Sequence, residues 1–143
     1  MQDCTKGGDE MTHTFFRPED GYLADCMPIY HEGVFYIFYL KDYHDKENYP
    51  EGTSWNLVCT RDFVHFEDKG EILRHHGKND PDLYLYTGCV IKKENIFHMF
   101  YVSHNPYFLQ EGKPRQGICH AVSSDLFHWE RCPKDDFFSP GGK

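Results

Sequence analysis

"DCMPIYHEGVFYIFYL", residues 25–40, aligns without gaps with "TGCVIKKENIFHMFYV", residues 87–102, so the chain contains an internal repeat. Each copy has an apolar run, a short polar turn and an aromatic-rich run with Phe-Tyr near its end. The turns, "HEGV" and "KENI", offer a Gly or an Asn where a hairpin needs a positive φ angle. Each copy therefore predicts a β-hairpin.

A second pair of matching segments follows the two predicted hairpins. "VCTRDFVHFED", residues 58–68, matches "AVSSDLFHWER", residues 121–131, through the pattern Ser/Thr-x-Asp-x-x-His-aromatic-Glu. The short side chains of Asp62 and Asp125 can accept hydrogen bonds from backbone N–H groups in a turn between two strands. The histidine of each copy is expected to pack or bond beside its turn.

Each repeat thus comprises four antiparallel strands over about 62 residues, which is the unit of a β-propeller blade. The predicted fold is all-β, with blade one at about residues 14–73 and blade two at about residues 82–138. A sandwich of eight short strands is the rival fold, but sandwich strands need not come in similar groups of four. Propellers contain about four to eight blades, so the chain is expected either to belong to a longer protein or to self-associate. Residues 1–13 are expected to be disordered, and residues 139–143 to form a tail.

Composition and charge narrow the classes of partner. The net charge of −8 disfavours nucleic acid, because a polyanion would be repelled, and permits a neutral ligand such as a saccharide. No run approaches the roughly 20 apolar residues that span a bilayer, and the N-terminus lacks a basic segment followed by an apolar one. We therefore expect no membrane partner and a cytoplasmic location.

The six cysteines and ten histidines do not indicate a metal or a cofactor. No C-x-x-C pair occurs, and three cysteines lie in apolar, strand-like runs, which favours reduced thiols. Cys119 and His120 are neighbours on a predicted strand, so their side chains should face opposite ways. His75 and His76 fall in a polar loop, where solvation is favoured over metal binding.

The blade pattern, with an aspartate at the start of the first inner strand, resembles the five-bladed propellers of glycoside hydrolase families 32 and 43. The β-fructosidases of family 32 are the most similar, and the resemblance covers roughly residues 14–138. In that family a Trp-Met-Asn-Asp-Pro-Asn-Gly motif precedes an apolar hairpin ending in Phe-Tyr. "YLADCMP", residues 22–28, occupies this place here. The resemblance implies that the chain forms the first two blades and that Asp25 is the nucleophile.

Further segments of the resemblance imply residues that contact a sugar. "SWNLVCTRDFVHFED" is similar to the family's Trp-Gly-His segment and places Trp55 on a substrate-facing tryptophan. "YTGCVI" is similar to Phe-Ser-Gly-Ser-Ala-Val and places Tyr86 and Thr87 beside the sugar. Tyr22 is expected to join the two aromatic residues in a platform for a sugar ring.

Glycoside hydrolysis needs two carboxyl groups, one to protonate the leaving oxygen and one to attack or to activate water. The family's Arg-Asp-Pro motif and its acid/base glutamate are absent from this sequence. "WERCPKDDFF", residues 129–138, looks like the acid/base motif, but Arg131 interrupts it and Glu130 aligns with Glu67 in the outer strand of the first repeat. Glu130 is therefore expected to be structural, and the chain alone to be inactive.

Two alternative functions remain open at the level of the sequence. Ala24-Asp25 also resembles the Ala-Asp-Pro of family 43, and Leu40 stands where family 32 has a glutamine that contacts sugar. An arabinosidase or xylosidase similar to family 43 is therefore the nearest enzymatic alternative. A carbohydrate-binding propeller module without catalytic activity is the other.

Overall fold

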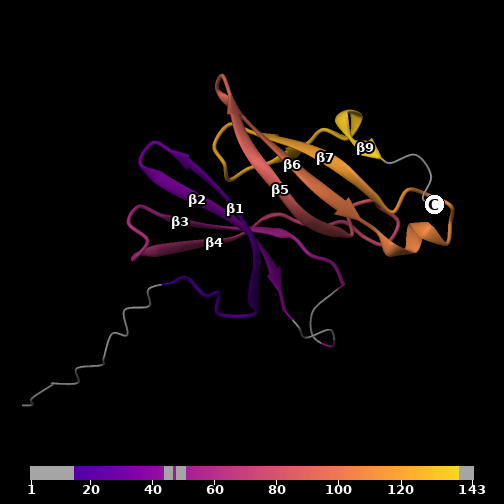
Figure 1. Ribbon diagram of the computed structural model, residues 1–143, viewed down its shortest axis with the longest axis horizontal. Coiled ribbons are helices and arrows are strands. Elements are labelled where there is room, and N and C mark those ends of the chain that lie inside the picture. The colour runs from indigo at the N-terminus through magenta and orange to yellow at the C-terminus, as the bar shows by residue number, and fades with distance from the viewer. Residues whose placement is uncertain (1–14, 44–46, 48–50, 139–143) are drawn as a thin grey trace, which may run out of the picture.

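The computed structural model describes residues 15–43, 47 and 51–138, which form two antiparallel β-sheets joined by loops (Figure 1). The segments predicted to be disordered or a tail, residues 1–13 and 139–143, lie outside the described residues. The first sheet has the strand order β1 (Tyr22–His31), β2 (Val34–Asp42), β3 (Trp55–Thr60), β4 (Phe66–Leu73). No helix in the described part of the chain is long and apolar enough to cross a membrane.

The second sheet repeats this order, except that its outer strand is broken. Its strands are β5 (Tyr84–Lys93), β6 (Ile96–His104), β7 (Gln116–Ser123), β8 (Glu130–Arg131) and β9 (Phe137–Phe138). Both β8 and β9 pair with β7, and a short 3₁₀ turn, η2 (Pro133–Asp135), separates them. Another 3₁₀ turn, η1 (Pro106–Leu109), follows β6. The predicted all-β fold with four-stranded antiparallel repeats is confirmed.

The two predicted hairpins form as the sequence indicates. In the first, Glu32 and Gly33 have φ angles of 48° and 80°, which matches the two positive φ angles of a tight hairpin turn. In the second, a positive φ of 56° falls on Glu94 and not on Asn95, where the sequence had placed it. Both hairpins therefore close through two residues in the register that the repeat predicts.

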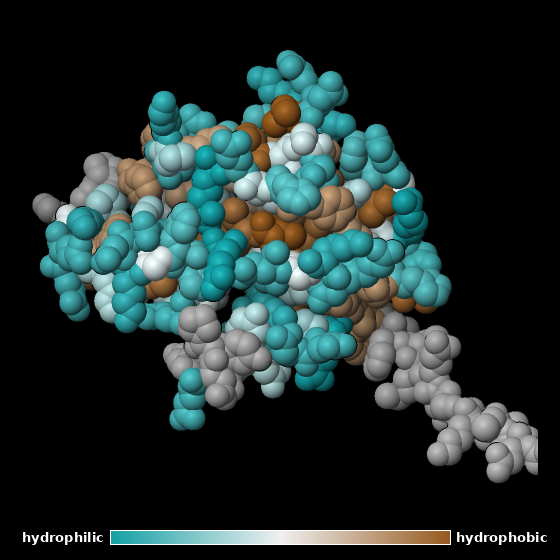
Figure 2. All heavy atoms as spheres, turned by 180° about the vertical axis from the view of Figure 1, so that it is seen from behind, coloured by the Kyte–Doolittle hydropathy of each residue, from teal (hydrophilic) through white to brown (hydrophobic). Residues whose placement is uncertain are grey.

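A single apolar cluster lies between the two sheets. Trp55, Phe38 and Leu57 from the first sheet have no exposed surface, nor has Met99 from the second. The indole of Trp55 packs with its ring centroid 5.8 Å from Phe38 and 6.3 Å from Tyr101, so it contacts both sheets. Figure 2 shows further apolar residues gathered in the middle of one face, with polar residues around them. Burial of this cluster is the main force that holds the two blades together.

A buried carboxylate links the second sheet to the segment between the sheets. The side chain of Asp82 is only 4% exposed, and it accepts hydrogen bonds from Arg131 Nε at 2.9 Å and Tyr101 Oη at 3.4 Å. His76 Nδ1 lies 2.7 Å from the other carboxylate oxygen. Arg131 also donates to the carbonyl of Arg74, so it joins β8 to the connection between the blades. A buried charge with this many partners is satisfied rather than costly.

The two aspartate turns have the same hydrogen bonds in both blades. Asp62 Oδ1 accepts from the backbone N–H groups of Val64 and His65, and its Oδ2 lies 2.7 Å from His65 Nδ1. Asp125 repeats the pattern with His128 at the same distance. The histidine side chains are 86% and 90% exposed, so they bond to the turn and do not pack into the core.

Asp25 lies within β1, not at its start as the sequence predicted. The register between β1 and β2 shifts between Ala24 and Cys26, so Asp25 is the extra residue of a β-bulge. Its φ angle of 35° is in the left-handed region, which costs energy for any residue with a Cβ. The register of β5 also shifts at the aligned position, between Leu85 and Gly88.

The strain at Asp25 predicts an unusual order of stability for two substitutions. Asp25→Gly and Asp25→Ala both lose the carboxylate, but only glycine adopts a positive φ without penalty. We expect the glycine variant to be more stable by about 1 kcal/mol, the reverse of the usual order within a strand. Urea unfolding of the two variants measures the difference, and an alanine variant of equal or greater stability would contradict the strain.

The aspartate turns predict how stability depends on pH. The backbone amide of His65, followed by its side chain, holds the pKa of the Asp62 carboxyl well below its ordinary value. For Asp125, burial raises the pKa, but the hydrogen bonds from His128, Phe127 and Ser123 outweigh burial and lower it. Because the pKa of each group is lower in the folded state than in the unfolded state, both stabilise the fold above pH of about 4.

This stabilisation is lost as the pH falls below about 4 toward the lowered folded pKa values. The melting temperature of the unmodified chain should therefore fall more steeply over this pH range than that of the double variant Asp62→Ala, Asp125→Ala. The double variant should also be less stable near neutral pH. Parallel pH profiles for the two proteins would exclude a contribution from these turns.

Candidate active site

The predicted nucleophile is held by a residue of the neighbouring blade. The inner strands β1 and β5 lie side by side (Figure 1), and Thr87 Oγ1 donates a hydrogen bond to Asp25 Oδ2. Both side chains are exposed to solvent. Because the two residues occupy the same position of the repeat, the bulges of the two inner strands meet there. The bond fixes the direction of the carboxylate and leaves the group open to a ligand.

The two predicted tyrosines both present ring surface to solvent. Tyr22 is 55% exposed, with the guanidinium of Arg17 6.0 Å from its ring centroid. Tyr86 is half-buried, and its ring stacks on His104 with centroids 5.3 Å apart and an angle of 18°. Tyr86 immediately precedes Thr87 in β5, so the same strand carries this aromatic stack and the hydrogen bond to Asp25.

Trp55 differs from the expectation of a residue that faces the substrate. Its side chain is completely buried between the sheets, so it offers no surface to a sugar. Its Nε1 donates a hydrogen bond of 3.0 Å to the carbonyl of Tyr86, a backbone group at the β5 bulge. Trp55 therefore supports the segment that carries Tyr86 and Thr87 from behind. A strand of six buried residues, as β3 is, gives no alternation from which to infer this direction.

A second carboxylate lies in the same region and was not found from the sequence. Glu51 accepts hydrogen bonds from Tyr84 Oη at 2.8 Å and Tyr107 Oη at 3.0 Å, and Lys78 Nζ lies 3.3 Å away. Tyr84 in turn lies 6.3 Å from Tyr86, centroid to centroid. The bond from Tyr84, followed by those from Tyr107 and Lys78, lowers the pKa of Glu51 against the effect of burial. A lowered pKa favours the ionised carboxylate, whereas a general acid needs a raised pKa.

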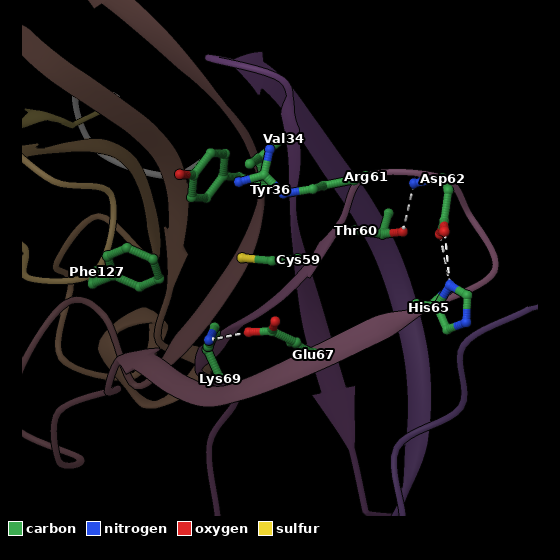
Figure 3. Close-up of a pocket in the computed structure, with 10 residues that line it drawn as sticks. All are labelled: Val34, Tyr36, Cys59, Thr60, Arg61, Asp62, His65, Glu67, Lys69 and Phe127. Carbon is green, nitrogen blue, oxygen red and sulfur yellow. Dashed lines mark hydrogen bonds and ion pairs between the residues drawn. The ribbon is translucent and has the colours of Figure 1, made fainter.

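Two cavities in the described part of the chain lie away from these residues. The first has a volume of about 310 Å³ and lies where β3 ends, around Cys59, Arg61 and the Asp62 turn (Figure 3). Phe127 of the second blade lines one side of it. The second, of about 290 Å³, is lined by residues that include Lys41 and Asn56. Neither cavity is lined by any of the predicted site residues. Asp25 and Thr87 themselves are exposed on the two inner strands.

The site could hold one half of a two-carboxylate reaction. Asp25 is exposed, oriented by Thr87 and in a strained backbone conformation of the kind that concentrates at functional sites. Glu130 lies in β8 at the outer edge of the second sheet, three strands from β5, which agrees with a structural role. The described residues therefore provide a candidate nucleophile and aromatic surface.

Comparison with known proteins gives one family and several similar folds. The Glycosyl hydrolases family 32 N-terminal domain matches residues 15–134. A levanbiose-producing levanase of Bacillus subtilis (strain 168) is 35% identical over 84 residues, which cover 57% of this chain and 15% of the levanase. The chain thus spans about a seventh of the length of this curated relative.

Two solved structures show where the fold belongs. The fructan 1-exohydrolase IIa of Cichorium intybus has a TM-score of 0.68 at 19% identity, covering 88% of this chain and 23% of that one. A family 43 enzyme of Xanthomonas citri has a TM-score of 0.59 at 16% identity, covering 78% and 32%. At such identities the likeness is one of fold, and it extends to both families, so only the sequence match separates them. The two sheets correspond to part of a five-bladed propeller, and the chain belongs to glycoside hydrolase family 32, whose N-terminal domain it matches.

Proposed function

We propose that this chain is the nucleophile-bearing part of a β-fructosidase and that a longer protein supplies the rest of the active site. The observation that carries the proposal is the exposed Asp25 carboxylate at a strained bulge, hydrogen-bonded to Thr87 of the next blade. A blade needs no carboxylate at this point for its own folding, because blade two has Thr87 there. The difference between the blades favours a chemical role for Asp25.

In the proposed reaction, Asp25 attacks the anomeric carbon of a fructosyl unit while a general acid protonates the departing glycosidic oxygen. Thr87 holds Oδ2, so Oδ1 forms the new bond and the glycosidic carbon–oxygen bond breaks. Water then attacks the covalent intermediate, with the acid now acting as a base, and releases the sugar and the free carboxylate. This sequence retains configuration and requires the two carboxyl groups to lie about 5–5.5 Å apart.

The aromatic residues suit the binding of a sugar ring. The Tyr86–His104 stack and the exposed ring of Tyr22 offer flat apolar surface, on which the C–H faces of a sugar can pack. Trp55 contributes by fixing the backbone of Tyr86 and makes no contact with the ligand. We propose fructosyl saccharides as the ligand class. A variant of the Cichorium intybus fructan 1-exohydrolase IIa was solved with 1-kestose, and a β-fructofuranosidase variant of Bombyx mori with sucrose.

In the longer protein, removal of the nucleophile should abolish turnover in a way that chemistry can restore. Asp25→Ala is expected to lower kcat by at least about 10³-fold. Added azide, a small external nucleophile, should restore part of the activity and yield a fructosyl azide. Glu130→Gln is the matched control, because this carboxylate lies at the outer edge of the sheet and should leave kcat unchanged.

Three results would separate the proposal from its alternatives. An Asp25→Ala variant with normal turnover would exclude Asp25 as nucleophile. Hydrolysis of arabinosides but not of fructosides would favour an enzyme similar to those of family 43. Saccharide binding without any hydrolysis, unaffected by Asp25→Ala, would indicate a carbohydrate-binding module.

The 143-residue chain by itself should not hydrolyse sucrose, inulin or an aryl glycoside. The reason is chemical: one carboxylate cannot serve both as nucleophile and as the acid that protonates the leaving group. Reducing-sugar and chromogenic assays test this. Turnover by the chain that Asp25→Asn abolishes would mean that it carries its own acid.

A further inference from the structure

Three potential metal ligands converge at the break in the outer strand of the second sheet. A ring nitrogen of His120 from β7, Cys132 Sγ and a carboxylate oxygen of Asp135 all lie within 4.8 Å of one another. Cys132 is the N-cap of η2 and Asp135 is its last residue, so their spacing is Cys-x-x-Asp. His120 is largely buried, and its Nδ1 lies 2.9 Å from Asp135 Oδ2.

The imidazole of His120 is held in place from its other side. His98 Nδ1 on β6 lies 3.0 Å from His120 Nε2, and the two rings are parallel to within 5°. The ring of Phe100 stacks on His120 with centroids 4.7 Å apart. A histidine that binds a metal through one nitrogen usually bonds through the other to a neighbouring group, which fixes the direction of the ring. His98 is in the position of such a neighbour.

The surroundings also favour a cation. The carboxylate of Asp136 accepts from the backbone N–H of His120 at 3.2 Å, and Glu130 precedes Cys132 by two residues. Two more carboxylates therefore accompany Asp135 at this edge, against Lys134 in the turn and Arg131, whose guanidinium is paired with Asp82. The negative charge raises the local concentration of cations.

We propose that His120, Cys132 and Asp135 form a zinc site that fastens the η2 turn to β7. Imidazole nitrogen, thiolate sulfur and carboxylate oxygen are the three ligand types that zinc binds, and a water would complete a tetrahedron. Tetrahedral ligand bonds of about 2.0–2.3 Å place the donors roughly 3.3–3.8 Å apart. His120 Nδ1 and Asp135 Oδ2, now 2.9 Å apart, must therefore separate slightly when zinc enters between them. The ion would stabilise the edge where η2 interrupts the outer strand between β8 and β9.

The protons balance when the ion binds. Without metal, His98 donates to His120 Nε2, and His120 donates from Nδ1 to Asp135. With zinc on Nδ1, the proton of His120 resides on Nε2 and is donated to His98, which takes its own proton on its far nitrogen. Cys132 binds as the thiolate, so one proton is released to solvent for each ion bound.

The alternative is a hydrogen-bond chain from His98 through His120 to Asp135 with no ion. These hydrogen bonds provide partners for the ring nitrogens of His120 and for His98 Nδ1, but Cys132 does not take part in them. The two cases therefore differ in whether the sulfur takes part in binding, and a probe of sulfur ligation separates them.

Titration of the 143-residue chain with Zn²⁺ and with Co²⁺ tests the proposal. We expect saturable binding of about one ion per chain, a raised melting temperature with Zn²⁺, and a sulfur-to-cobalt charge-transfer band with Co²⁺. Cys132→Ser should remove the charge-transfer band, and Asp135→Asn should weaken zinc binding. His98→Phe, which keeps an aromatic ring beside His120, should weaken zinc binding by about tenfold.

Cys89→Ser is the matched control, since Cys89 is an exposed free thiol on β5, and it should leave binding and the cobalt spectrum unchanged. Circular dichroism of each metal-free variant verifies that the sheets form. The proposal fails if the unmodified chain binds no Zn²⁺ saturably, or if binding survives Cys132→Ser and Asp135→Asn. It fails also if Cys89→Ser weakens binding as much as Cys132→Ser.

Discussion

The burial of one indole between two sheets couples the core of this protein to its candidate site. Trp55 has no exposed surface, and a buried N–H group needs a hydrogen-bond acceptor. The acceptor is the carbonyl of Tyr86, which lies where the β5 register shifts and the ladder to β6 is locally broken. The same irregularity turns the next residue, Thr87, toward the first blade, where it bonds to Asp25. Core packing, the bulge and the direction of the carboxylate are therefore parts of one arrangement.

The repeat uses one backbone feature for two purposes. Both inner strands have an irregularity at the same position, but blade one has Asp25 there and blade two has Thr87. A threonine hydroxyl donates a hydrogen bond that a carboxylate can accept, so the blades complement each other because they differ. The positive φ of Asp25 lowers the stability of the fold. Such a cost is expected where a residue is retained for its function and not for the fold.

Arg131 is the residue by which the segment at the outer edge of blade two differs from the family's acid/base motif, and the structure gives it a role of its own. The residue that interrupts "WE–CP" extends its guanidinium to the buried Asp82 and to the carbonyl of Arg74. It thus joins β8 to the segment between the blades, which is a structural task. The break in the outer strand that follows brings Cys132 and Asp135 close to His120 of β7.

The sequence by itself determined the strands, the hairpins, the aspartate turns and the family, because these depend on local periodicity, turn chemistry and a repeat that can be aligned. It also placed Asp25 and Thr87 at equivalent positions, although not in contact. Only the tertiary structure decided that Trp55 faces the core, that Glu51 gathers Tyr84 and Tyr107, and that His120 meets Cys132. Those contacts depend on how one sheet packs on the other and on which strands the connecting loops lie against. No spacing along the chain encodes such long-range contacts.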